Sequence, residues 1–158
     1  MKPRLLWFAI PMLAVACGPK FIAWSQVPDT PENRVVADLV EKYRQAIEKR
    51  DVQALKQIVS RRYFANAGTT SESGDDYGYD QLEQKVMPLL QESVKSVQYH
   101  VYLRKIERTA PDRASAEFEF YYKFFYVDGG KDRWVANNDF MRLDLALEDG
   151  VWRIAGGL

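Results

Sequence analysis

The segment ASAEFEFYYKFFY, residues 114–126, restricts the fold of this chain more than any other stretch. Apolar side chains occupy every second position, and the positions between them include Ser115, Glu117, Glu119 and Lys123. Side chains that alternate with a period of two lie on opposite faces of a strand, so the segment predicts a long strand with one apolar face. Such a strand cannot bury that face by itself. It requires neighbouring strands and a covering layer.

Three further strands are predicted beside this one. The first begins near Val94, and its apolar face consists of Val97, Tyr99, Val101 and Leu103. The other two cover residues 133–147 and 151–155. The turn sequences between strands are Pro111-Asp112, Asp128-Gly129-Gly130 and Asp149-Gly150. Because these connections are short, neighbouring strands are expected to run antiparallel as a meander.

Three helices are predicted before the strands. Residues 30–32, Thr-Pro-Glu, form a helix start with a capping hydroxyl, a proline at the first helical position and an acid in the first turn. Asp51 caps a short second helix. Asp80 with Glu83 matches the capping box of a third helix, which Pro88 kinks or shortens. The order of elements predicts an α+β domain with its helices on one face of the sheet.

The amino terminus, MKPRLLWFAIPMLAVACGPK, predicts export. Lys2 and Arg4 form a positive region, and residues 5–16 form an apolar run that is shorter than the roughly 20 residues of a membrane-spanning helix. Cys17 follows the small residues of LAVA and is the only cysteine of the chain. A lone cysteine in an exported protein has no disulfide partner, so it requires another explanation.

The junction before Cys17 resembles the lipobox of bacterial lipoproteins, in which the signal is cut before a cysteine that carries the lipid. It departs from that pattern in one respect, because Ala14 stands where leucine is preferred. The alternative is a secreted protein with a free thiol. The resemblance implies a membrane-anchored protein, and Gly18, in place of the aspartate that resembles an inner-membrane retention signal, favours the outer membrane.

These interpretations divide the chain into a signal peptide at residues 1–16, a lipidated cysteine with its tether at 17–32, and a folded domain at 33–158. The tether contains Phe21 and Trp24. These two aromatic side chains are expected to rest on the membrane or on the domain.

Residue counts exclude several classes of function. The chain has 22 basic and 22 acidic residues and no basic block, so nucleic acid is not an expected partner. A single histidine and a single cysteine make zinc sites, Ser-His-Asp triads and Cys-His pairs implausible. That histidine, His100, shares the polar face of its strand and is expected at the surface. No metal or cofactor is predicted.

The sequence VEKYRQAIEKRDVQAL at residues 40–55 and the ending DGVWRIAGGL resemble the nuclear transport factor 2-like superfamily, which includes ketosteroid isomerases and polyketide cyclases. The resemblance extends over residues 33–158 and implies a cone-shaped domain. It places Tyr43 where the isomerases carry a tyrosine that donates to substrate, although the helical stripe favours a tyrosine packed in the core. Asn66 and its neighbours stand where those enzymes place a proton-abstracting aspartate, so their mechanism is not inherited.

Candidate ligand-contacting residues come from two regions. In the resembling fold the segment RYFANAGTTSESGDDYGYD, residues 62–80, rims the opening of the cone. The carboxylate of Asp139 shares parity with the apolar positions of its strand, which predicts that it points into the cone as an acid, a base or an orienting group. The alternatives are a bulge that turns it outward, or a tyrosine or backbone donor that satisfies it. The predicted ligand-contacting residues are Tyr43, Tyr63, Asn66, Tyr79, Tyr122, Asn137 and Asp139.

Three functions fit these observations. The first is a lipid-anchored envelope protein whose cone binds a small molecule or a protein partner without chemistry. The second is a lyase, isomerase or cyclase that uses Asp139 with pocket tyrosines. The third, compatible with either, is a homodimer formed through the outward aromatic residues of the sheet, which are Tyr102, Tyr121, Phe125, Trp134 and Phe140.

Overall fold

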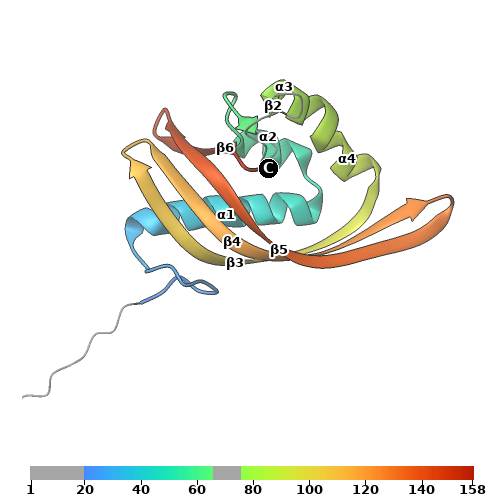
Figure 1. Cartoon of the computed structure of the whole chain (residues 1–158), viewed down its shortest axis with the longest axis horizontal. Helices are drawn as coiled ribbons and strands as arrows, with labels where there is room; N and C mark the ends of the chain where they lie inside the picture. The colour runs from blue at the N-terminus through green and yellow to red at the C-terminus, as the bar shows by residue number, and fades with distance from the viewer. Residues whose placement is uncertain (1–19, 66–75) are drawn as a thin grey trace, which may run out of the picture.

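The computed structural model describes residues 20–65 and 76–158, which fold as helices packed on one face of a curved antiparallel sheet (Figure 1). The helical elements are α1 (Pro31–Lys49), α2 (Val52–Ile58), α3 (Tyr79–Gln81), the π-helical turn η1 (Leu82–Val86) and α4 (Met87–Glu92). The strands are β1 (Phe64–Ala65), β2 (Tyr77–Gly78), β3 (Val94–Ala110), β4 (Arg113–Asp128), β5 (Lys131–Glu148) and β6 (Val151–Gly156). The predicted α+β cone with a four-stranded meander is confirmed.

Two of the three predicted helix starts are confirmed. Thr30 caps α1 by accepting from the backbone N–H of Asn33, and Asp51 caps α2 in the same way. The third is wrong, because the helix begins at Tyr79 after a Gly78 cap and Asp80 lies inside its first turn. The wide turn η1 then precedes Pro88, whose missing N–H cannot join a regular α-helical ladder.

The core lies between α1 and the inward face of the sheet. Phe118, at the middle of β4, is completely buried, and its ring centroid lies 6.2 Å from that of Tyr43 on α1. The pairing of β4 with β5 runs from Arg113–Ala146 to Asp128–Lys131 without a bulge. Every second side chain of both strands therefore keeps its face along the whole length of the pair.

The last strand, β6, is much shorter than the strand beside it. It pairs only with residues 144–148 of β5. In the described part of the chain, the rest of β5 has a neighbour on one side only, which is β4. The paired ends of β4 and β5 thus extend beyond the helices, as the right side of Figure 1 shows.

Residues 20–29, expected as part of a tether, form a small hairpin on the domain. The backbone N–H of Ile22 donates to Val27 (2.9 Å), and that of Gln26 donates to Leu103 of β3 (2.9 Å). Val27 is buried in the core cluster. Within the described residues, no helix is long and apolar enough to cross a membrane.

The end of α2 is joined to the sheet by a buried hydroxyl. The Ser60 hydroxyl donates to the Glu148 carboxylate (2.7 Å), and the backbone N–H of Ser60 donates to Ile154 of β6 (2.8 Å). Arg62 also donates to Glu148 (3.1 Å). The hydrogen bond from Ser60 is the main cause that lowers the pKa of Glu148, against a smaller opposing effect of burial.

We expect Glu148→Gln to lower the free energy of unfolding at neutral pH by about 1 kcal/mol, because charge-assisted hydrogen bonds are lost. A lowered folded pKa stabilises the fold above the unfolded pKa of about 4.3, and this contribution is lost as the pH falls through the folded value. The difference between parent and variant should therefore shrink in acid. Urea unfolding across this pH range measures it, with the exposed Glu92→Gln as control. A difference that grows in acid would contradict the assignment.

Candidate functional site

Four aromatic residues occupy successive inward positions of β4 and form an aromatic ladder, which comprises Phe118, Phe120, Tyr122 and Phe124. The ring centroids of Phe120 and Tyr122 lie 5.8 Å apart, and those of Tyr122 and Phe124 lie 4.8 Å apart in a stacked arrangement. Phe118 is fully buried, whereas the other three are half-buried. The ladder therefore runs from the core toward the outer end of the sheet.

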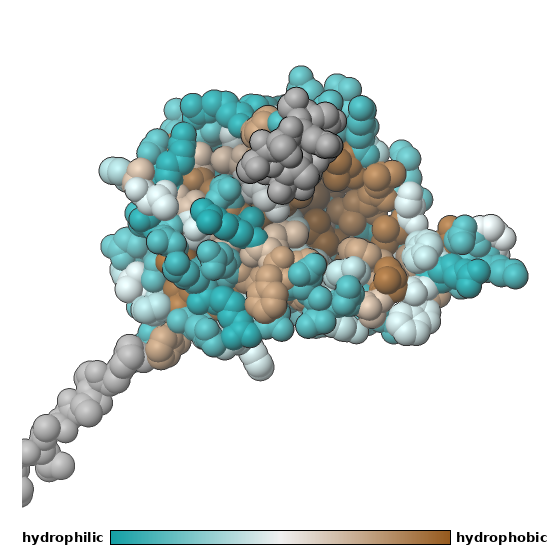
Figure 2. Space-filling view, in the orientation of Figure 1, coloured by the Kyte–Doolittle hydropathy of each residue, from teal (hydrophilic) through white to brown (hydrophobic). Residues whose placement is uncertain are grey.

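The three half-buried residues of the ladder, here called its rungs, belong to a larger apolar region. Figure 2 shows hydrophobic residues gathered in a recess between the helices and the β4–β5 end of the sheet. Apolar side chains that pack against the core and remain partly exposed include Leu90, Val94, Phe120, Tyr122, Phe124 and Met141. A recess of this kind suits an apolar or aromatic ligand.

Two buried tyrosines adjoin the inner end of the ladder. Tyr99 of β3 lies 5.5 Å from Phe120 between ring centroids, and Tyr43 of α1 lies 6.0 Å from Tyr99. Burial raises the pKa of Tyr43 to about 12, and burial is also the main cause that raises the pKa of Tyr99. Both phenols therefore stay protonated near neutral pH. The Tyr43 hydroxyl lies 3.7 Å from the sulfur of Met141.

The β4–β5 register brings three of the predicted site residues together. Tyr122 pairs with Asn137, and Phe120 pairs with Asp139, so all four side chains belong to the inward face. Asn137 and Asp139 are nevertheless exposed to solvent. They lie on the part of β5 that β6 does not reach.

Asn137 and Asp139 satisfy backbone donors of their own strand. The Asn137 side chain accepts from the N–H of Asn138 (2.9 Å), and the Asp139 carboxylate accepts from the N–H of Phe140 (2.7 Å). A strand without a neighbour on one side leaves N–H groups without ladder partners, and these side chains supply acceptors. Asp139 is thus a solvated carboxylate with a local hydrogen bond, at the outer end of the ladder.

Tyr63 is buried, and its hydroxyl is engaged by the end of the chain. It donates to the carbonyl of Leu158 (2.9 Å) and accepts from the Leu158 N–H (2.9 Å), while Tyr77 donates to the same carbonyl. Burial is the main cause that raises the pKa of Tyr63. This network joins the β1–β2 pair to Leu158, two residues after β6, and it uses the Tyr63 hydroxyl that was expected to contact a ligand.

Tyr79 is also buried, beneath the guanidinium of Arg61, which lies 4.3 Å from the ring centroid. Its hydroxyl has no hydrogen-bond partner among the described residues. Asn66 and Cys17 lie outside the described residues. In residues 20–65 and 76–158, no three His, Cys, Asp or Glu side chains are grouped so as to hold a metal ion.

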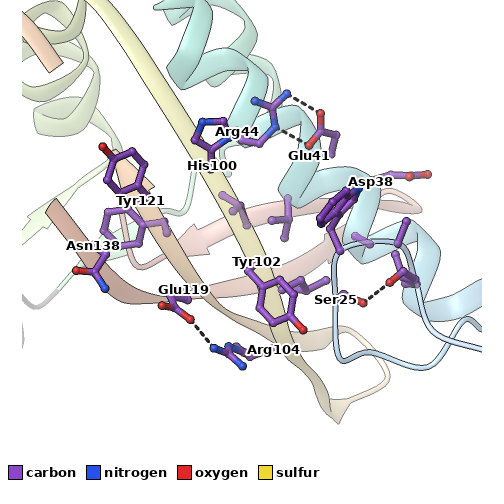
Figure 3. Close-up of a pocket in the computed structure, with 18 residues that line it drawn as sticks. Ser25, Asp38, Glu41, Arg44, His100, Tyr102, Arg104, Glu119, Tyr121 and Asn138 are labelled. Carbon is purple, nitrogen blue, oxygen red and sulfur yellow. Dashed lines mark hydrogen bonds and ion pairs between the residues drawn. The ribbon is translucent and has the colours of Figure 1, made fainter. Parts of the chain in front are cut away.

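A second concave region, absent from the predictions, lies at the edge of β3. It is a groove of about 970 Å³ between the hairpin of residues 20–29, α1 and the β3–β4 pair (Figure 3). Arg44 pairs with Glu41 and Glu48, each at 2.7 Å, and Arg104 pairs with Glu119. One wall of the groove is the hairpin of residues 20–29, which the sequence analysis treated as a tether. The apolar Val27 was an indication in the sequence that this segment packs on the domain.

His100 lines this groove and lies, as predicted, on the exposed polar face of β3. Its ring stacks on that of Tyr121, with centroids 6.2 Å apart (Figure 3). The two residues are paired in register, on the face of the sheet opposite to the ladder. The charged groups that line the groove are largely paired with one another.

The two regions differ in what they can do chemically. In the described part of the chain, the buried polar or charged residues other than tyrosine are Ser60 and Ser115, so no carboxylate or imidazole is buried beside the ladder. Proton abstraction needs a base within hydrogen-bond reach of a bound substrate. The ladder instead offers apolar ring faces and protonated phenols, which are groups suited to contacting and orienting an apolar ligand.

No protein-family model matches the chain, and no curated protein matches it in sequence. Several solved structures, by contrast, superpose on the chain. A nuclear transport factor 2-like superfamily protein from Salmonella enterica serovar Typhimurium superposes with a TM-score of 0.63 at 16% identity, over 78% of this chain and 86% of that one. The chain has the nuclear transport factor 2-like fold.

Other solved structures with this fold carry different descriptions. A ketosteroid isomerase-like protein from Erwinia carotovora atroseptica matches with a TM-score of 0.62 at 17% identity, over 82% of this chain and 95% of that one. A hexachlorocyclohexane dehydrochlorinase of type 2 matches with a TM-score of 0.58 at 15% identity, over 80% of this chain and 82% of that one. These superpositions establish the architecture alone, and function depends on the site.

Proposed function

We propose that the nuclear transport factor 2-like domain is a binding module for a planar, apolar small molecule, which lies on the half-buried rungs of the aromatic ladder. The observation that carries this proposal is the contrast along β4, where Phe118 is buried but Phe120, Tyr122 and Phe124 remain partly exposed. Exposed aromatic faces in a recess favour flat apolar ligands through stacking and apolar burial.

Binding without chemistry fits the polar groups around the ladder. Asp139 is solvated and accepts from the N–H of Phe140, so its environment gives no reason for it to act as a base. Asn137 and Asp139 lie beside the outer rungs in register, where they can accept from a donor on the ligand. We therefore assign them a role in orientation.

Tyr122→Ala should weaken binding of N-phenyl-1-naphthylamine, an uncharged fluorescent aromatic amine, by about 1–2 kcal/mol, because a stacking surface is lost. Asp139→Asn should weaken it by about 1–3 kcal/mol if the amine donates to the carboxylate. Fluorescence titration of the purified protein measures both.

The matched control is Tyr121→Ala, which removes the same side chain from the adjacent position on the opposite face of β4. Its affinity for the probe should equal that of the parent. Equal affinity of the parent and Tyr122→Ala would overturn the proposed site.

We further propose that the protein is a bacterial lipoprotein anchored through Cys17, exported and located on the periplasmic side of the outer membrane. The support lies in the sequence, where a positive region and a short apolar run end directly before the only cysteine. An envelope location would give the domain access to exported or imported small molecules.

Cys17→Ser should abolish both lipid labelling and membrane association when the protein is expressed in a bacterium, because the acceptor of the lipid is lost. Metabolic labelling with a fatty-acid analogue and membrane fractionation measure the two effects. Parent protein that carries no label and fractionates like the variant would contradict lipidation.

The outer face of the sheet supports a third proposal, self-association. Trp134 and Phe140 of β5 are 63% and 70% exposed, and Tyr121 of β4 lies on the same face. Large exposed aromatic side chains on one surface are typical of protein interfaces. We propose that two copies pair through this face, which leaves the aromatic ladder free.

Light scattering of the lipid-free protein at micromolar concentration should give the mass of a dimer, and the double variant Trp134→Ala/Phe140→Ala should give that of a monomer. Leu89→Ala removes an exposed apolar side chain from α4 instead and should remain dimeric. A monomeric parent would refute the interface.

A further inference from the structure

The hairpin of residues 20–29 presents a tryptophan to solvent. Trp24 is 86% exposed at its turn, and Phe21 is 53% exposed. The backbone of Trp24 has a φ of 57°, a left-handed conformation that bulky residues rarely adopt. Trp24 is therefore not a core residue, and its backbone conformation is a costly one for a bulky side chain.

The hairpin holds Trp24 in a defined position. The Ser25 hydroxyl donates to the carbonyl of Ile22 (2.8 Å) and accepts from the N–H of Val27 (3.0 Å). The bond from Gln26 to Leu103 fixes the hairpin to the edge of β3. The position of Trp24 is therefore linked to the orientation of the whole sheet.

The hairpin also begins very close to the proposed lipid. Lys20 lies three positions after Cys17, and an extended chain spans at most about 3.6 Å per residue. A lipid on Cys17 therefore keeps Lys20 within about 11 Å of the modified residue, whatever path the intervening chain takes. Lys20 adds a positive charge that suits anionic headgroups.

We infer that the hairpin of residues 20–29 is a membrane-contact element, in which Trp24 and Phe21 lie at the level of the lipid headgroups. Tryptophan, whose apolar ring carries a polar N–H, favours this region of a bilayer, and the exposed apolar ring of Phe21 adjoins it in the same hairpin. The inference rests on the proposed lipid anchor. It adds that the domain sits on the bilayer in one orientation, with the amino-terminal end of α1 next to the membrane and the β4–β5 turn at the far end (Figure 1).

Quenching of tryptophan fluorescence by lipids brominated near the headgroup end of their acyl chains tests the contact. All proteins carry Trp7→Phe, so that the reporters are Trp24, Trp134 and Trp152. Full-length protein purified from bacterial membranes is reconstituted into vesicles of phosphatidylethanolamine and phosphatidylglycerol. We expect quenching in this parent and its loss in Trp24→Phe.

Trp134→Phe is the matched control, because it removes another strongly exposed tryptophan, near the opposite end of the sheet, and it should retain the quenching. Loss of quenching in Trp134→Phe, or its persistence in Trp24→Phe, would overturn the inference. So would an unquenched parent that mass spectrometry shows to be lipidated, and that result would leave the anchor intact.

Different results would overturn the membrane-contact inference and the lipid-anchor proposal. If mass spectrometry finds no lipid on Cys17, the anchor proposal fails. The same proteins are then coupled through Cys17, their only cysteine, to a maleimide lipid in the vesicles. Quenching that depends on Trp24 would still support the contact, and its absence would overturn it.

Discussion

The packing of Phe118 against α1 is the contact on which the rest of this molecule depends. Phe118 is fully buried at the centre of β4, with Tyr43 on one side and the paired residues of β3 and β5 on the others. Because inward positions recur every second residue, fixing this one ring fixes the face of every other side chain on the strand. Phe120, Tyr122 and Phe124 must then point the same way, even where helical cover ends.

The candidate site thus exists because β4 and β5 are longer than both β6 and the helical layer that covers them. β4 and β5 continue past the layer that covers Phe118, while β6 stops after six residues. The inward face that would be core in a fully covered sheet becomes a half-exposed aromatic ladder. Because β6 is short, β5 also has an edge without a neighbouring strand among the described residues, where Asn137 and Asp139 accept hydrogen bonds from the backbone next to them.

Much of this could be predicted from the sequence, because alternation determines which face a residue occupies. The parity of Asp139 correctly placed it on the face of Phe120. Parity carries no information about how far neighbouring elements extend, so the exposure of Asp139 depended on the length of β6. The hydrogen-bond partner of the Tyr63 hydroxyl could not be predicted from local sequence either, because Leu158 lies 95 positions away in the chain. The Asp80 cap failed because the nearby Gly78 starts the helix earlier than the capping box requires.

The two concave regions of the domain face different surroundings under the proposed anchoring. The groove lies beside the hairpin of residues 20–29, which places it next to the bilayer, whereas the β4–β5 end that carries the outer rungs of the ladder points away (Figure 1). A ligand on the ladder would then enter from the aqueous side. Because a planar apolar compound is sparingly soluble in water, its burial there would be favoured by roughly 25 cal/mol for each Å² of apolar surface removed from solvent. An anchored domain with this orientation would hold such a compound on the aqueous side of the membrane.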